Sequence, residues 1–133
     1  MKKVLILMAT YNGAKYLDEQ IQSLIEQKNV QVDILVRDDG STDNTIEVLN
    51  KWKEQNKLEW YKGKHLNVQF GFYDLMERAR TRDVDYLAFC DQDDVWDLDK
   101  LCIAVEKLEK LCNKSMPALY YCGQRLVLSL IHI

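Results

Sequence analysis

The sequence predicts an α/β fold in which a largely parallel sheet carries helices on both faces. Short apolar runs alternate with amphipathic stretches at helical spacing along almost the whole chain, the order that builds β-α-β units. Polar loops follow several of the apolar runs, and parallel strands bring such loops to one edge of the sheet. Right-handed crossovers would then distribute the helices over both faces.

The first half of the chain contains two continuous apolar runs, which are typical of strands buried on both faces. Residues 4–8 form the first strand and end at the loop Thr10-Tyr11-Asn12-Gly13, and residues 32–36 form the second, closed by Asp38-Asp39-Gly40-Ser41. The helices after these strands are predicted from the spacing of Leu17, Ile21, Leu24 and Ile25, and of Ile46, Leu49 and Trp52. Asn44 and Glu47 are expected to cap the second helix.

The second half continues the pattern to about five strands. Residues 58–61 predict a weaker third strand, Tyr86–Cys90 a buried fourth strand, and residues 119–122 a short fifth strand after Pro117. The intervening helices are predicted from Phe72, Leu75, Met76 and Ala79, and from Leu98, Leu101, Cys102, Val105 and Leu108. Asp97 is the expected N-cap of the last helix.

Composition excludes several classes of protein. The chain has 133 residues, 47% of them hydrophobic and 29% charged, which is typical of a single globular domain. A net charge of −3 gives no electrostatic reason to expect a nucleic-acid partner. Apolar runs are too short for a membrane span, and no signal peptide is evident, so a cytoplasmic location is expected. Cys90, Cys102, Cys112 and Cys122 lack zinc-site spacing and are interpreted as small core side chains.

An acidic cluster, Asp91-Gln92-Asp93-Asp94, directly follows the fourth strand. Carboxylates this close repel one another unless a cation or hydrogen bonds compensate them. A divalent metal that carries a phosphorylated ligand is the expected compensation. The alternative is a solvated acidic loop that caps the next helix.

Two residues in the earlier loops are candidates for binding a nucleobase. Tyr11 could stack on a base, which typically contributes about 1 to 3 kcal/mol, or be an ordinary aromatic at the rim. Asp39 could accept a hydrogen bond from an imide N–H, which would favour uracil or thymine over cytosine. Residues 38–43 also fit a plain turn and helix start.

Three stretches together resemble the family 2 glycosyltransferases of the Rossmann-like GT-A fold. They are residues 4–13 (VLILMATYNG), 36–45 (VRDDGSTDNT) and 86–101 (YLAFCDQDDVWDLDKL), in the order and spacing of the family. The form FCDQDDVW is most similar to the rhamnosyltransferase-like branch, which builds bacterial surface polysaccharides.

The resemblance implies a nucleoside-diphosphate sugar as donor, with uridine or thymidine as the nucleoside, and inverting transfer to a saccharide or lipid-linked saccharide acceptor. It implies that Asp91 and Asp93 bind Mg²⁺ or Mn²⁺ as the acids of a D-x-D motif, with Asp94 as a neighbour. The implied nucleotide-sugar-binding residues are Ala9, Thr10, Tyr11, Asp39, Asp91 and Gln92. The general base is expected in a later, C-terminal part of such enzymes, so no catalytic residue is assigned here, and this chain alone is expected to be inactive.

Residues 1–127 are accordingly predicted to be the N-terminal nucleotide-sugar-binding part of a GT-A domain, working at the inner face of the membrane in the complete protein. Residues 128–133 resemble a translated sequencing adapter and are predicted to be a non-native tail. Two alternatives stay open. Asp91-x-Asp93-x-Val95 could serve a phosphatase of the haloacid-dehalogenase type, and the chain could be a non-catalytic nucleotide- or metal-binding module.

Overall fold

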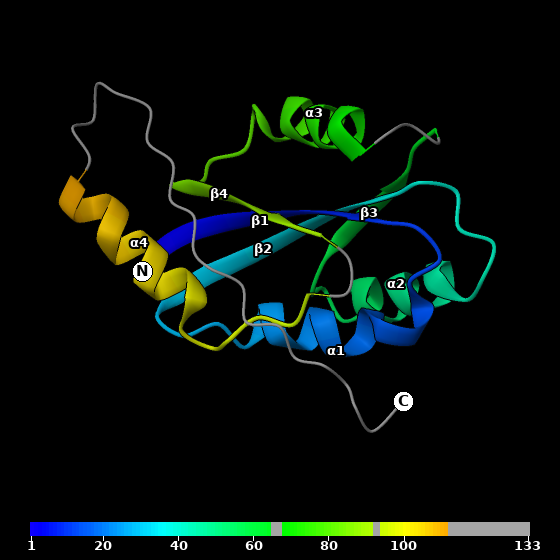
Figure 1. Ribbon diagram of the computed structural model, residues 1–133, viewed down its shortest axis with the longest axis horizontal. Coiled ribbons are helices and arrows are strands. Elements are labelled where there is room, and N and C mark those ends of the chain that lie inside the picture. Colours follow the sequence, from blue (N-terminus) through cyan, green and yellow to red (C-terminus); the bar gives the residue numbers. More distant parts are fainter. Residues whose placement is uncertain (65–67, 92–93, 112–133) are drawn as a thin grey trace.

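The computed structural model describes residues 1–64, 68–91 and 94–111, and the predicted alternation of strands and helices is present in them (Figure 1). The strands and helices in chain order are β1 (Lys2–Thr10), α1 (Ala14–Ile25), β2 (Val30–Asp38), α2 (Thr45–Glu54), β3 (Glu59–Lys62), α3 (Val68–Ala79), β4 (Tyr86–Cys90) and α4 (Lys100–Leu111). The predicted α/β fold class is therefore confirmed.

The described strands form one parallel sheet in the order β3-β2-β1-β4. Thr10 at the end of β1 is in register with Asp38 at the end of β2, and Met8 is in register with Cys90 at the end of β4. The loops after β1, β2 and β4 therefore leave the sheet at the same edge, as the sequence predicted.

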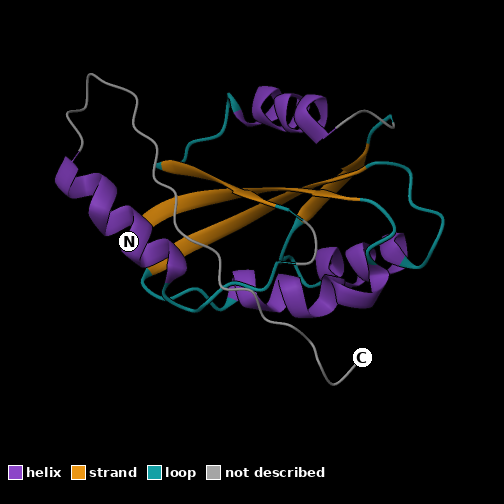
Figure 2. Ribbon diagram, in the orientation of Figure 1, coloured by secondary structure: helices purple, strands orange, loops and turns teal. Residues whose placement is uncertain are grey.

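Helices cover both faces of the sheet, with α3 on one side and α1 and α2 on the other (Figure 2). Successive residues of β1 point to opposite faces and are buried on both, which explains its uninterrupted apolar sequence. The larger core includes Val4, Ile6 and Met8 of β1, Ile21 and Leu24 of α1, Leu49 of α2 and Leu101 of α4. The smaller core includes Leu5, Leu7, Leu35, Leu75 and Ala79, the last two from α3.

The prediction that Tyr86–Cys90 is a buried strand is wrong for most of its residues. Cys90 is buried, but Leu87 is 43% exposed and Phe89 is 46% exposed. The reason is that β4 lies at the edge of the described sheet, and α3 covers its outer face only in part. Phe89 meets Phe72 of α3 edge-on, with 5.5 Å between ring centroids.

Two predicted helix starts also differ. Asn44 occupies the N-cap position of α2 but makes no side-chain capping bond; the preceding Asp43 accepts a bond from Thr45 N at 2.9 Å through Oδ1. The last helix begins at Lys100, so Asp97 lies before the N-cap position and Leu98 is not on the helix. The Asp97 carbonyl instead accepts a bond from Lys100 N at 3.1 Å, in a turn that precedes α4.

The predicted fifth strand at residues 119–122 and the tail at residues 128–133 lie outside the described residues, and both stay predictions. Cys112 and Cys122 lie outside them as well, whereas Cys90 is a buried free thiol and Cys102 is half-buried. None of the helices in the described ranges is long and apolar enough to cross a membrane.

Candidate functional site

The shared edge of β1, β2 and β4 brings together residues that lie far apart in the sequence. Asp39 follows β2 and donates its backbone N–H to the carbonyl of Thr10 at 2.9 Å. Tyr11 comes next in the chain and is 41% exposed, while Asp91 is exposed directly after β4. The fold thus gathers Thr10, Tyr11, Asp39 and Asp91 at one edge, with Ala9 half-buried in β1 beside them.

Asn12 fastens the loop after β1 to the loop after β2. Its side-chain oxygen accepts hydrogen bonds from Thr42 N at 2.8 Å and Asp43 N at 3.3 Å, and its own N–H donates to Ser41 Oγ at 2.9 Å. Asn12 has a φ of 49°, a conformation that asparagine tolerates better than most residues. Because both the backbone N–H and the side-chain oxygen of Asn12 are bonded to the loop after β2, the backbone of the neighbouring Tyr11 is held against that loop.

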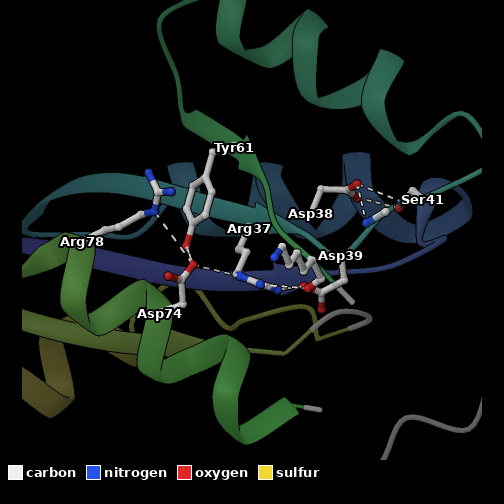
Figure 3. A network of polar contacts seen from close by, with 9 residues as sticks. Arg37, Asp38, Asp39, Ser41, Tyr61, Asp74 and Arg78 are labelled. Carbon is white, nitrogen blue, oxygen red and sulfur yellow. Dashed lines mark hydrogen bonds and ion pairs between the residues drawn. The ribbon is translucent and has the colours of Figure 1, made fainter. Parts of the chain in front are cut away.

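Asp38 serves the turn after β2. It is fully buried, and its Oδ2 accepts bonds from Gly40 N at 3.1 Å and Ser41 N at 2.9 Å (Figure 3). Gly40 has a φ of 93°, which a residue with a side chain would rarely adopt. The turn interpretation of residues 38–43 is therefore correct for Asp38. The Asp39 side chain does not accept these two bonds of the turn.

Arg37 is the central residue of this edge, and the sequence motifs did not single it out. Its side chain is almost completely buried, at 3% exposure, and all three of its nitrogens are bonded (Figure 3). NH1 pairs with Asp39 Oδ1, Nε donates to Asp74 Oδ2 at 3.0 Å, and NH2 donates to the Lys64 carbonyl at 2.9 Å. The carboxylate proposed to read a base is thus held by a buried cation.

A second layer of polar contacts surrounds Asp74. Tyr61 donates its hydroxyl to Asp74 Oδ2 at 2.6 Å, and the Arg78 guanidinium lies 3.7 Å from the centre of the Tyr61 ring. The hydrogen bond from Tyr61, followed by the contacts of Arg37, lowers the pKa of Asp74. Burial, together with the bond to Asp74, raises the pKa of the Tyr61 phenol. Asp74 is therefore an anion and Tyr61 a neutral donor near pH 7.

One signal in the sequence could have revealed this network. Arg37 directly follows the apolar run 34–36 within β2, and a cation at the end of a buried strand must find anionic partners. Asp39 is the adjacent candidate. Asp74 and Tyr61 carry no comparable signal, because only the packing of α3 and β3 against β2 brings them to the guanidinium.

The acidic cluster after β4 is described only at its ends. Asp91 is exposed and Asp94 is half-buried, whereas Gln92 and Asp93 lie outside the described residues. In residues 1–64, 68–91 and 94–111 no three acidic, histidine or cysteine side chains come together as metal ligands. Burial raises the pKa of the Cys90 thiol to about 12, and the charges of Asp94 and Asp91 act in the same direction. Two carboxylates therefore act on the Cys90 thiol at the end of β4.

Polar side chains in and just after α1 hold the segment that follows β4. Ser23 Oγ accepts a bond from Trp96 N at 3.1 Å. Gln27 donates to the Asp97 carbonyl at 2.7 Å and accepts from Leu101 N at 2.9 Å, and Gln20 donates to the Asp91 carbonyl. All three side chains are buried. Because they bond backbone on both sides of Asp94, they fix where the acidic cluster leaves and rejoins the fold.

Gln27→Ala is expected to reduce the free energy of unfolding by about 1 to 3 kcal/mol, because it leaves the buried N–H of Leu101 without its acceptor and removes one of the two donors to the Asp97 carbonyl. Gln22→Ala is the matched control. Gln22 is exposed and its side chain donates to Glu26 Oε1 at 2.7 Å, so its loss is expected to change stability by less than about 0.5 kcal/mol. Urea unfolding measures both. Equal effects would contradict a holding role for Gln27.

Comparison with known proteins identifies the family. The chain is 36% identical over 127 residues to a dTDP-rhamnosyl transferase of Shigella flexneri, covering 86% of this chain and 42% of that protein. It therefore spans less than half the length of this relative.

Among solved structures, S. aureus TarS 1-349 in complex with UDP-GlcNAc matches with a TM-score of 0.63 and 26% identity, over 83% of this chain and 32% of the other. A mannosyltransferase from Pyrobaculum calidifontis in complex with GDP-Man and Mn²⁺ has a TM-score of 0.67 at 24% identity, over 79% and 32%. These likenesses confirm the predicted GT-A fold. The family model "Glycosyl transferase family 2" matches residues 5–127, nearly the entire chain, and the chain belongs to that family.

Proposed function

We propose that this chain binds the nucleoside-diphosphate sugar donor of a glycosyltransferase, with uridine or thymidine as the nucleoside. The observation that carries the proposal is the meeting of Thr10, Tyr11, Asp39 and Asp91 at one edge of the sheet. An exposed aromatic ring can stack on a base, and a carboxylate paired with a cation can accept a hydrogen bond from it. An acidic strand end can serve the ribose and, through a metal ion, the diphosphate.

The relatives support the choice of donor. The Shigella relative is named for a dTDP-sugar, and the S. aureus structure holds UDP-GlcNAc. Uracil and thymine present the same imide N–H, and a single acceptor such as Asp39 serves both. The phosphatase alternative has no support from the family match, and it would leave Tyr11 and Asp39 without a role.

A divalent cation, Mg²⁺ or Mn²⁺, fits the donor set at the end of β4. Asp91 and Asp93 would hold it, because carboxylate oxygens are the ligands both ions prefer. When bound, the ion supplies positive charge to the departing diphosphate. Of this chain's own residues, Asp91 and Gln92 would contact the donor there, and Thr10 and Ala9 would border the ribose.

Transfer itself needs more than donor binding. We propose inverting transfer to a saccharide or lipid-linked saccharide acceptor in bacterial surface polysaccharide synthesis. A carboxylate must remove the proton of the acceptor hydroxyl as the new bond forms, and we assign that role to no residue of this chain. The binding half of the reaction is what the residues at this edge can perform.

Tyr11→Ala is expected to weaken UDP binding by about 1 to 3 kcal/mol if the ring stacks on the base. Tyr16→Ala is the matched control, because Tyr16 is 46% exposed but lies on α1. Calorimetry with UDP and Mn²⁺ measures both variants. If Tyr11→Ala keeps the affinity of the unaltered chain, the base does not lie on this ring.

A further inference from the structure

Arg37 is a buried cation paired directly with Asp39, the residue proposed to recognise the base. Its guanidinium sits among groups from separate elements: Asp39 after β2, Asp74 of α3 and the Lys64 carbonyl after β3. With each nitrogen bonded, the guanidinium has one orientation, and it fixes the Asp39 carboxylate in turn.

The pairing leaves Asp39 with a defined capacity for hydrogen bonds. Arg37 NH1 occupies Oδ1, and within the described part of the chain no hydrogen bond reaches Oδ2. The Asp39 side chain is 14% exposed, so a ligand at the edge can reach it. The guanidinium at Oδ1 fixes the orientation of the carboxylate, and the oxygens of a carboxylate accept hydrogen bonds but donate none.

We infer that Arg37 is a specificity-determining positioning residue: by holding the Asp39 carboxylate in one orientation, it makes the site accept uracil or thymine and reject cytosine. Uracil and thymine donate N3–H to such an oxygen. Cytosine has an unprotonated N3, which would face the carboxylate lone pairs, whereas a neutral carboxyl could donate to that nitrogen. The inference rests on the proposed function, because it requires Asp39 to face the base.

The close approach of Gly63 to the Arg37 guanidinium independently shows that the surrounding residues fit closely around this group. A Cβ built on Gly63 would lie 2.3 Å from Arg37 Cζ and 2.4 Å from NH2. The guanidinium could yield only by breaking bonds that hold it, since it is buried and bonded at every nitrogen. Gly63 also donates its N–H to the Asp38 carbonyl at 2.8 Å, a bond that alanine would retain.

The test compares UDP and CDP binding to the full chain by calorimetry at a fixed Mn²⁺ concentration. The quantity measured is the ratio of the two dissociation constants. Gly63→Ala displaces the guanidinium without changing any charge, and Arg37→Lys keeps the charge but cannot bond three partners from one nitrogen. Both are expected to reduce the preference for UDP by about tenfold or more.

Tyr61→Phe is the control for a general structural effect. It removes the bond to Asp74 but leaves the pairing of Arg37 with Asp39, so it is expected to lower stability while the UDP preference stays unchanged. A fall in affinity for both nucleotides with a constant ratio in Gly63→Ala and Arg37→Lys would overturn the inference.

Asp39→Asn separates this inference from the proposed function. If Asp39→Asn abolishes the UDP preference and the Arg37 and Gly63 variants keep it, Asp39 reads the base but Arg37 does not set the selectivity. If Asp39→Asn itself keeps the preference, the base has been assigned to the wrong loop. Should one of the two variants fail to fold, the other decides the question, and thermal unfolding of each identifies that case.

Discussion

Arg37→Met is expected to lower the free energy of unfolding by about 3 to 5 kcal/mol, the usual cost of removing one partner from a buried ion pair. Methionine fills much of the space but returns none of the bonds, so Asp39 loses its cation and the Lys64 carbonyl loses its donor. This loss is a large part of the total free energy of unfolding of a domain of this size. Urea unfolding followed by circular dichroism measures the loss.

Arg82→Met is the matched control for this substitution. Arg82 pairs with Glu59 at 2.6 Å, but the pair is on the surface, and such pairs contribute about 0 to 1 kcal/mol. Similar losses for the two variants would contradict the central place given to Arg37.

Arg37→Met is also expected to change how the free energy of unfolding depends on pH in the acid range. The pKa of Asp74 is lowered from 3.8 in the folded protein, so its ionised contacts stabilise the fold above that value, and this contribution is lost as pH falls through the lower folded pKa. The hydrogen bond from Tyr61 lowers this pKa most, burial opposes it, and the hydrogen bond and charge of Arg37 lower it further. Removing Arg37 should therefore raise the pKa of Asp74 towards 3.8 and make stability less dependent on pH there.

UDP is expected to bind this chain in Mn²⁺ and to bind about 100-fold more weakly in chelator. The acidic cluster alone repels a diphosphate, and a bound cation reverses that repulsion; a difference of about 3 kcal/mol corresponds to this factor. Calorimetry under the two conditions measures it. Equal binding in chelator would remove the metal from the proposed function.

Substitution within the acidic region refines the assignment. Asp93→Asn is expected to abolish most of the metal-dependent gain, because it removes a proposed ligand. Asp97→Asn makes the same chemical change four residues later, in the turn before α4, and is expected to leave UDP binding nearly unchanged. A larger effect at Asp97 would place the cation elsewhere.

The sequence by itself determined the alternation of strands and helices, since burial on two faces demands continuous apolar runs such as that of β1 and one-sided burial demands the spacing seen in α1. It also determined that the polar loops would share an edge, because parallel strands carry their carboxyl ends together. It misjudged β4, whose apolar residues fit a buried strand equally well. Sequence pattern records the polarity of side chains but not a strand's position in the sheet.

Only the tertiary structure decided how the residues at the edge are held. Asp39 and Tyr11 could be named from the chain, but Asp74 meets Arg37, and Tyr61 meets Asp74, because α3 and β3 pack against β2. Likewise, the sequence gives no sign that Gln27 is more than an ordinary polar residue, whereas in the fold it bonds the backbone of Asp97 and Leu101. The physical reason is that a buried charge or amide is satisfied by whatever the fold brings within hydrogen-bonding distance. Those partners lie tens of residues away, at separations that no local pattern encodes.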